Sequence, residues 1–217
     1  MNLQGLSEAF PPQPHWTAQD VPDLSDKVIA ITGGYGGIGY YTLKALLDKN
    51  AKVYVLGRNE SLFDDALIRL ASESPPITRK PLFIQCDLSS LHSPVEAARQ
   101  LSLQEPKLDI LFCNAGVMVP PVGSMTEAGR DLQWGTNVMG HWILINNLLP
   151  VLLKVWEESN GVDKARVVHT SSSGHQYAPT PTIDWESLKA DKNGNAGNGH
   201  FRWVLYGQAS RAVLLFD

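Results

Sequence analysis

The sequence has few cysteines and no long apolar run, and each shortage excludes a class of protein. The N-terminus lacks a basic segment followed by an apolar one, and no stretch of about 18 consecutive apolar residues occurs, so neither a signal peptide nor a membrane-spanning helix is predicted. We expect a cytoplasmic protein.

Cys86 and Cys113 each end a predicted strand. The usual doubly wound strand order separates them by several spacings of roughly 4.8 Å, beyond the roughly 7 Å that a disulfide bridges, so we predict two core thiols.

An excess of positive charge is also lacking. The chain has 18 Lys and Arg against 22 Asp and Glu, mixed along its length, for a net charge of −4. No basic face suited to a phosphate backbone is therefore predicted, which excludes nucleic acid as a partner. The six histidines lie on different predicted elements without a ligand spacing, so no metal site is predicted.

Apolar segments of strand and helix length alternate along most of the 217 residues. Because parallel strands need crossover helices, this order predicts a single α/β domain over residues 26–217 with a Rossmann-type doubly wound parallel sheet. Residues 1–25, which are rich in proline, are predicted to form an extended arm that packs on the domain or frays. The predicted strands are 28–32, 52–56, 82–86, 108–113 and 166–170, and the predicted helices are 38–49, 61–72, 93–103, 126–158 and one from about residue 205.

Two local features modify this outline. Pro150 stands inside the predicted helix 126–158 and is expected to kink or split it. The tract 193–199 is rich in glycine and asparagine, and its composition predicts a flexible loop.

A glycine cluster follows the first predicted strand and opens a helix. It can be aligned as Gly34-x-Gly36-x-x-Gly39 or as Thr32-Gly33-x-x-x-Gly37-x-Gly39. Glycines let a pyrophosphate approach the backbone, and the helix N-terminus presents free N–H groups to it. We therefore predict a dinucleotide site with cofactor contacts from Gly33, Tyr35, Gly37, Ile38 and Gly39.

The ends of the next strands refine the predicted cofactor. NAD-binding enzymes commonly carry an acidic residue at the end of the second strand, whereas this chain has Gly57 and Arg58 there, so NADP is favoured. The alternative is that Arg58 is only a solvated loop cation. Asp87 ends the third strand, where it could cap a turn, but its coincidence with the other strand ends favours contact with the cofactor. The other predicted cofactor contacts at these strand ends are Leu88, Asn114, Ala115 and Gly116.

These motifs together resemble the short-chain dehydrogenases/reductases, and within them the retinol-dehydrogenase-like and fungal reductase-like members. The resemblance covers residues 26–216 and rests on Thr32-Gly33-x-x-x-Gly37-Ile38-Gly39, Asn114-Ala115-Gly116, Asn137, Ser171-Ser172 and Tyr206-Gly-Gln208. It implies that Tyr206 is the general acid or base, that Ser172 holds the substrate oxygen, and that Asn137 helps to organise a proton-relay water. Ser171 and Ser173 are the neighbouring alternatives to Ser172.

The sequence departs from the family at the residue four positions after Tyr206. A lysine there normally stabilises the phenolate of a tyrosine whose free pKa is ~10, but this chain has Ser210. Arg211 lies about 100° further around the helix and is expected to point elsewhere. An alignment that treats Ala209 as an insertion would place Arg211 at the lysine position, at the expense of a distorted helix.

The resemblance also predicts the overall activity. The family normally continues into further C-terminal strands and lid helices, so we expect an incomplete domain. The first hypothesis is an NADP-dependent oxidoreductase that transfers a hydride between nicotinamide and a carbonyl or secondary alcohol of an apolar small molecule. The alternative is a catalytically silent nucleotide-binding or dimerising fragment of such an enzyme. In the family, the helices around 127–155 and after Tyr206 form a dimer face, so an exposed Trp142 would favour a homodimer.

Overall fold

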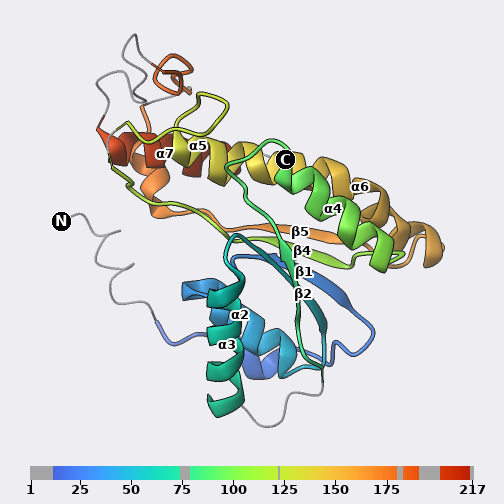
Figure 1. Ribbon diagram of the computed structural model, residues 1–217. Coiled ribbons are helices and arrows are strands. Elements are labelled where there is room, and N and C mark those ends of the chain that lie inside the picture. Colours follow the sequence, from blue (N-terminus) through green and yellow to red (C-terminus); the bar gives the residue numbers. More distant parts are fainter. Residues whose placement is uncertain (1–11, 74–78, 122, 180–182, 191–200, 216–217) are drawn as a thin grey trace.

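A computed structural model describes residues 12–73, 79–121, 123–179, 183–190 and 201–215 (Figure 1). Five parallel strands form one sheet in the order β3-β2-β1-β4-β5. The strands are β1 (Val28–Thr32), β2 (Lys52–Gly57), β3 (Leu82–Gln85), β4 (Ile110–Cys113) and β5 (Arg166–His169). The predicted Rossmann-type α/β fold is confirmed, and the predicted strand boundaries are correct to within two residues.

Helices cover both faces of this sheet. In Figure 1, α2 (Gly37–Leu47) and α3 (Glu60–Glu73) lie on one side, and α4 (Ser93–Gln104) and α6 (His141–Glu158) lie on the other. Successive strand residues point to opposite faces, so Ile29 and Ile31 pack with α2 and α3 while Ala30 packs with α4 and α6. The chain changes direction across the sheet between β1 and β4, which places a ligand crevice at the carboxyl ends of these strands.

The described part of the N-terminal arm packs on the domain. It contains a short 3₁₀ turn, η1 (Ala18–Asp20), and the Leu24 N–H donates to the Lys49 carbonyl at 2.7 Å. Lys49 in turn donates from Nζ to the Gln19 carbonyl at 2.8 Å. The packing that was predicted for this arm is therefore observed for its second half, while residues 1–11 lie outside the described part of the chain.

The helical stretch predicted for 126–158 begins later than expected and is not regular. Residues 126–130 form a turn in which Gly129 has φ +66°, and helix α5 (Leu132–Trp134) follows. A π-helical segment, η2 (Gly135–Gly140), connects α5 to α6. The predicted split at Pro150 is wrong, because α6 continues through it; Pro150 is exposed, so the carbonyl that lacks its N–H partner faces water.

The continuous helical run Leu132–Glu158 is, by length and composition alone, long and apolar enough to cross a bilayer. A helix that covers a sheet meets the same two criteria. In this run Leu144, Leu148 and Leu152 pack against the sheet and α4 as part of the core. The run therefore gives only weak support for a membrane span.

The C-terminal part contributes a 3₁₀ segment, η3 (Ser173–Tyr177), and helix α7 (Arg202–Val213), which starts three residues before the predicted position. The loop predicted at 193–199 lies outside the described residues. Cys86 and Cys113 are buried and unpaired, as predicted. Burial raises the pKa of the Cys86 thiol to about 12 and also raises that of Cys113, so neither thiol is a reactive thiolate near neutral pH.

Candidate functional site

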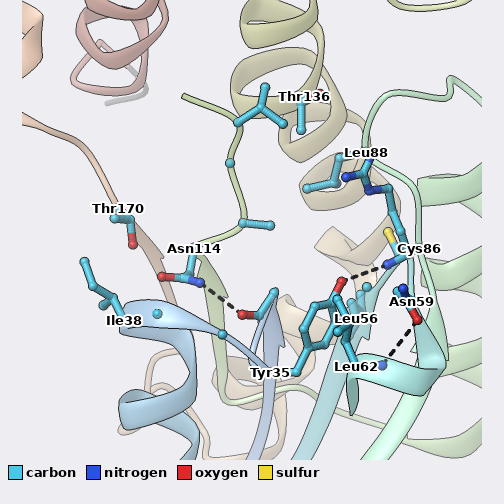
Figure 2. A pocket seen from close by; sticks show the side chains of 18 of the residues that line it. Tyr35, Ile38, Leu56, Asn59, Leu62, Cys86, Leu88, Asn114, Thr136 and Thr170 are labelled. Atoms are coloured by element: carbon cyan, nitrogen blue, oxygen red, sulfur yellow. Dashed lines mark hydrogen bonds between the residues drawn. The ribbon is translucent and has the colours of Figure 1, made fainter. Parts of the chain in front are cut away.

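Two neighbouring cavities open at the carboxyl ends of the strands. The first, here called the large cleft, has a volume of about 910 Å³ and is lined by the turn between β1 and α2, the end of β2 and the segment after β4 (Figure 2). The second, here called the small cavity, has a volume of about 160 Å³ and is lined by residues that include Asn137, Tyr206 and Ser210. Residues 114–118 and Thr170 line both, so the two cavities share a wall.

The glycine turn presents an open backbone to the large cleft. A Cβ added at Gly36 or Gly37 would meet no protein atom within 4 Å, and Gly37 has φ +51°. Gly39 differs, because a Cβ there would overlap the Gly33 carbonyl oxygen and the side-chain amide of Asn114. Gly36 and Gly37 therefore leave space for a ligand, whereas Gly39 lets α2 pack closely against the end of β1.

The end of β2 is shaped by a contact between Gly57 and Tyr35. The Tyr35 ring lies over Gly57 so closely that a Cβ at Gly57 would overlap it, and the Tyr35 hydroxyl accepts a hydrogen bond from the Arg58 N–H at 3.2 Å. The Gln85 side-chain amide donates to the Arg58 carbonyl at 2.9 Å. These bonds fix the Arg58 backbone at the cleft, and its exposed side chain lines the cleft wall.

Asp87 has the local role that was one of its two predicted alternatives. Its Oδ1 accepts hydrogen bonds from the Ser89 N–H at 2.9 Å and from the Ser89 hydroxyl at 2.7 Å. The residues on either side of it, Cys86 and Leu88, line the large cleft, whereas Asp87 does not. The structure thus uses the carboxylate to cap the turn after β3 and presents its neighbours to the cleft.

Tyr206 and Ser172 converge on Gly174. A Cβ added at Gly174 would lie 2.9 Å from Tyr206 Cε1 and 3.2 Å from Ser172 Oγ. Ser172 Oγ accepts the Gly174 N–H at 3.0 Å, which leaves the hydroxyl proton able to donate elsewhere. The two neighbouring serines differ, because Ser171 donates to the Ser210 carbonyl at 2.9 Å and Ser173 is exposed.

Ser210, and not Arg211, faces the small cavity. Ser210 is buried and lines that cavity together with Tyr206. The Arg211 guanidinium donates to the carbonyls of His175 at 3.1 Å and Pro179 at 3.2 Å. Helix α7 is regular over these positions, so the ungapped alignment describes the structure and no distortion brings Arg211 to the lysine position.

Asn137 holds the wall that the two cavities share. Its side chain accepts the Val117 N–H at 2.8 Å and donates to the Val117 carbonyl at 2.9 Å. Because both ends of the amide are engaged, the side chain positions the backbone of Val117, while the main-chain carbonyl of Asn137 lies 3.1 Å from His141 Nδ1. This carbonyl lies in η2, where the regular α-helical hydrogen bonds are broken.

The structure brings most of the predicted cofactor contacts together around the large cleft. Those that line it are Gly33, Tyr35, Gly37, Ile38, Arg58, Leu88, Asn114, Ala115 and Gly116. Gly39 and Asp87 support this wall from behind.

Sequence reasoning missed three residues at this site. Thr136 lines the large cleft, and its buried hydroxyl has no hydrogen-bond partner within the described part of the chain. Thr32 and His141 are buried behind the segment after β4 and hydrogen-bond to each other. The sequence signal for Thr136 and His141 is their proximity to Asn137, and that for Thr32 is its place at the start of the glycine motif.

Among the described residues, no group of three His, Cys, Asp or Glu side chains is arranged to hold a metal ion. Burial lowers the pKa of His141 to about 4 and also lowers that of His169, whose ring lies 6.4 Å away. Burial raises the pKa of Asp131, whose carboxylate caps α5.

Comparisons with known proteins agree with this geometry. Residues 27–183 match the short chain dehydrogenase family. A short-chain dehydrogenase/reductase of Armillaria gallica is 37% identical over 211 residues, which cover 97% of this chain and 64% of the relative. The chain spans between 58% and 64% of the length of this and two other curated fungal relatives.

Solved structures show the same architecture. An uncharacterised protein from Mycobacterium paratuberculosis superposes with a TM-score of 0.73 at 29% identity, covering 93% of this chain and 63% of that one. A short-chain dehydrogenase from Escherichia coli in complex with NADPH superposes with a TM-score of 0.61 at 25% identity, covering 87% and 68%. With the glycine turn, the strand order and the residues at the strand ends, these matches show that the chain belongs to the short-chain dehydrogenase family.

Proposed function

We propose that the chain binds NADP(H) in the large cleft and is an oxidoreductase that transfers a hydride between nicotinamide and a carbonyl or secondary alcohol of an apolar small molecule. The observation that carries this proposal is the pairing of an open glycine turn with Gly57 and Arg58 at the end of β2. Val117, Met118 and Val213 in the small cavity favour an apolar substrate.

The cleft fits a dinucleotide in three respects. Its volume of about 910 Å³ lies within the range of roughly 300–1,000 Å³ that is typical of small-molecule sites. Gly36 and Gly37 leave open space in front of the α2 N-terminus, where backbone N–H groups can bind a pyrophosphate. The orphan hydroxyl of Thr136 gains a partner if a polar group of the cofactor lies against it.

The end of β2 favours NADP over NAD. Gly57 provides no carboxylate to repel a 2′-phosphate, and the Arg58 guanidinium has no hydrogen bond or ion pair with the described residues around it. A phosphate oxygen would pair with this guanidinium in a charge-assisted bond. The similar Escherichia coli structure in complex with NADPH supports the same assignment.

Tyr206 in the small cavity and Ser172, which meets Tyr206 at Gly174, supply the groups for proton transfer. The bound nicotinamide would give or accept the hydride. The Tyr206 phenol would exchange a proton with the substrate oxygen, and the Ser172 hydroxyl, which already accepts the Gly174 N–H, would donate to that oxygen. Asn137 would keep Val117 in place beside the reacting groups.

A second candidate function is a nucleotide-binding protein that turns over slowly or not at all. Ser210 favours it, because an uncharged hydroxyl stands in the cavity wall where the family has a lysine. The nearest cation along α7, Arg211, is held by the His175 and Pro179 carbonyls and does not line the cavity. Cofactor-dependent turnover by the purified chain distinguishes the two candidates.

The cofactor assignment is tested by fluorescence titration of NADPH and NADH into the wild type, Arg58→Ala and a control, Arg99→Ala. Arg99 is an exposed arginine paired with Glu96 on α4, away from the cleft. We expect Arg58→Ala to weaken NADPH binding by about tenfold or more with little change for NADH, since a charge-assisted bond contributes roughly 1.5–3 kcal/mol, while Arg99→Ala changes neither. Equal affinities for the two cofactors in the wild type would refute the assignment.

We also infer that the protein pairs with a second copy through α6. Its exposed apolar residues Trp142, Leu149, Leu153 and Trp156 form a stripe at helical spacing. In the family, this helix contributes to a dimer face, as the resemblance implies. Light scattering is expected to give the mass of a dimer for the wild type and a lower mass for Leu153→Glu, and a monomeric wild type would contradict the inference.

A further inference from the structure

His141 is a buried imidazole to which neither cofactor binding nor proton transfer assigns a role. It is the first residue of α6, one turn after Asn137, and only 2% of it is exposed. Its Nε2 lies 2.9 Å from the Thr32 hydroxyl oxygen at the end of β1. Its Nδ1 lies 3.1 Å from the main-chain carbonyl of Asn137 in η2. The ring thus connects the end of β1 to the π-helical segment.

The partners of the two ring nitrogens determine where the proton sits. A carbonyl oxygen only accepts, so Nδ1 must carry the hydrogen that faces Asn137. Nε2 is then an acceptor, and the Thr32 hydroxyl donates to it. The same hydroxyl oxygen accepts the N–H groups of Asn114 and Ala115, each at 2.9 Å. In the other neutral tautomer, the Nε2–H would be a third N–H donor against a Thr32 oxygen that already accepts two, the hydroxyl proton would turn to the Phe112 carbonyl 3.4 Å away, and an unprotonated Nδ1 would face the Asn137 carbonyl.

These bonds close a ring around the wall that the two cavities share. The Thr32 hydroxyl binds the N–H groups of residues 114 and 115, and the Asn137 side chain binds the N–H and the carbonyl of Val117. His141 is hydrogen-bonded to both Thr32 and Asn137. The segment 114–117 is therefore held at both ends from behind. A substitution at His141 removes the link between Thr32 and Asn137, but it removes no atom that lines the large cleft.

We propose that His141 is a positioning residue that, as the neutral Nδ1–H tautomer, holds the segment 114–117 in the position that binds the nicotinamide dinucleotide. This inference rests on the proposed function. A protonated ring would place a third N–H donor against the Thr32 oxygen, which already accepts two, and break the connection. The other titratable side chains that line the small cavity with His141 are Cys113, His169 and Tyr206; no carboxylate is among them, so no anionic side chain of this lining stabilises the charged ring.

Substitutions at each end of the connection test the proposal through NADPH affinity. His141→Phe removes both ring bonds, and Thr32→Val removes the hydroxyl, whereas Thr32→Ser keeps it. His92→Phe, at an exposed histidine before α4, is the matched control. We expect NADPH to bind about tenfold more weakly to His141→Phe and Thr32→Val, with near wild-type affinity in Thr32→Ser and His92→Phe. The double variant His141→Phe/Thr32→Val should lose less than the sum of the two single losses.

The ring nitrogens of His141, observed by ¹⁵N NMR on the wild type, provide a readout that does not depend on the variants folding. We expect a protonated Nδ1 and an unprotonated Nε2 across neutral and mildly acidic pH. An Nε2–H tautomer, or unchanged NADPH affinity in folded His141→Phe, would overturn the proposal. A wild type that binds neither cofactor would instead refute the proposed function, and the NMR result would still report the tautomer.

Discussion

The glycine turn and the Tyr206 end of the site lie at the same edge of the sheet, but they are held by different interactions. At the glycine turn, Asn114 donates to the Thr32 carbonyl at 3.1 Å. Behind the cleft, Thr32 is hydrogen-bonded to His141 of α6, and Asn137 of η2 to Val117. At the other end, the Tyr206 helix contacts the core through a smaller apolar cluster that includes Trp134, Leu188 and Ala209. The comparison teaches that the proposed cofactor binding and the proposed proton transfer use different side chains on either side of a shared wall, so each can be tested by its own substitutions.

The two ends also differ in charge. The large cleft has a cation, Arg58, at the position where a 2′-phosphate is expected, whereas the Tyr206 cavity has an uncharged Ser210 where a cation is expected. The large cleft therefore has a cation for the expected 2′-phosphate, whereas the Tyr206 cavity has none at position 210 to stabilise a phenolate. The substitutions at glycines 36 and 57, Thr136 and Ser210 below each change one end, whereas the acid-stability prediction concerns His141 behind the wall that both ends share.

The largest expected effect comes from two glycines of the same turn. Gly36→Val should abolish NADPH binding and leave the melting temperature close to that of the wild type. A Cβ at this position points into the proposed ligand space with no protein atom within 4 Å, and the extended backbone of Gly36 is one that valine tolerates. Gly39→Val should lower the melting temperature as well, because its side chain would overlap the Gly33 carbonyl. Binding and melting are measured on the same samples, and a Gly36→Val protein that binds NADPH normally would show that the turn is only structural.

A second prediction concerns acid stability. The pKa of His141 is about 4 in the folded protein against 6.5 for a free histidine, so the unfolded chain binds more protons between these values. Stability should therefore fall as pH drops from about 6.5 to about 4, by an amount on the order of 3 kcal/mol from this residue. His169 shifts in the same direction and adds to the loss.

The contribution of His141 to this loss is isolated by comparison with His141→Gln. Urea unfolding at neutral pH and at a pH close to 4 should show a smaller loss in the variant than in the wild type. Equal losses in the two proteins would mean that His141 does not titrate as the structure indicates.

A third prediction concerns the contact between Tyr35 and Gly57. Gly57→Ala should displace the Tyr35 ring and weaken NADPH binding several-fold, since overpacking costs about 1–3 kcal/mol. In a Tyr35→Ala background the same substitution has room, so Gly57→Ala should then have little effect. An equal effect of Gly57→Ala in both backgrounds would contradict the contact.

The smallest effect is expected at Thr136. Thr136→Val removes a buried hydroxyl that has no partner among the described residues, so the free protein should be as stable as the wild type or slightly more so. If the cofactor supplies the missing partner, NADPH affinity should fall several-fold. Calorimetric titration and thermal melting measure the two quantities, and unchanged affinity would place the cofactor away from this hydroxyl.

Much of the fold could be predicted from local patterns. Alternation of apolar strands and helices was sufficient for the parallel sheet, and the residues at strand ends were sufficient for most of the cleft wall, because carboxyl ends of parallel strands meet at one edge. Pro150 was misjudged because tertiary packing holds α6 together on either side of it. The π-helical segment was not anticipated, and the two hydrogen bonds between its Asn137 side chain and Val117, 20 residues away, are not marked by any local pattern.

The hydrogen bond between Thr32 and His141 could not be predicted from the sequence either. The two residues are 109 positions apart, and no spacing in the sequence marks them as partners. Asp87 could be placed at the sheet edge from the sequence, but its role could not be chosen, because it depends on whether the carboxylate points to the cleft or to Ser89. Local sequence identifies which groups gather at the sheet edge, but hydrogen-bond partners decide which of them face the ligand.

The most direct test of the difference between the two ends is the rate of NADPH oxidation at saturating cofactor, measured with a panel of ketones for the wild type, Ser210→Lys and Tyr206→Phe. We expect the wild type to bind NADPH and turn over slowly, because loss of acid–base assistance corresponds to roughly 10²–10⁴ in rate. Ser210→Lys should be faster at unchanged NADPH affinity, and Tyr206→Phe should abolish what activity remains. Rapid turnover by the wild type that is lost in Tyr206→Phe and not increased by Ser210→Lys would contradict the account, because the site would then need no cation at position 210.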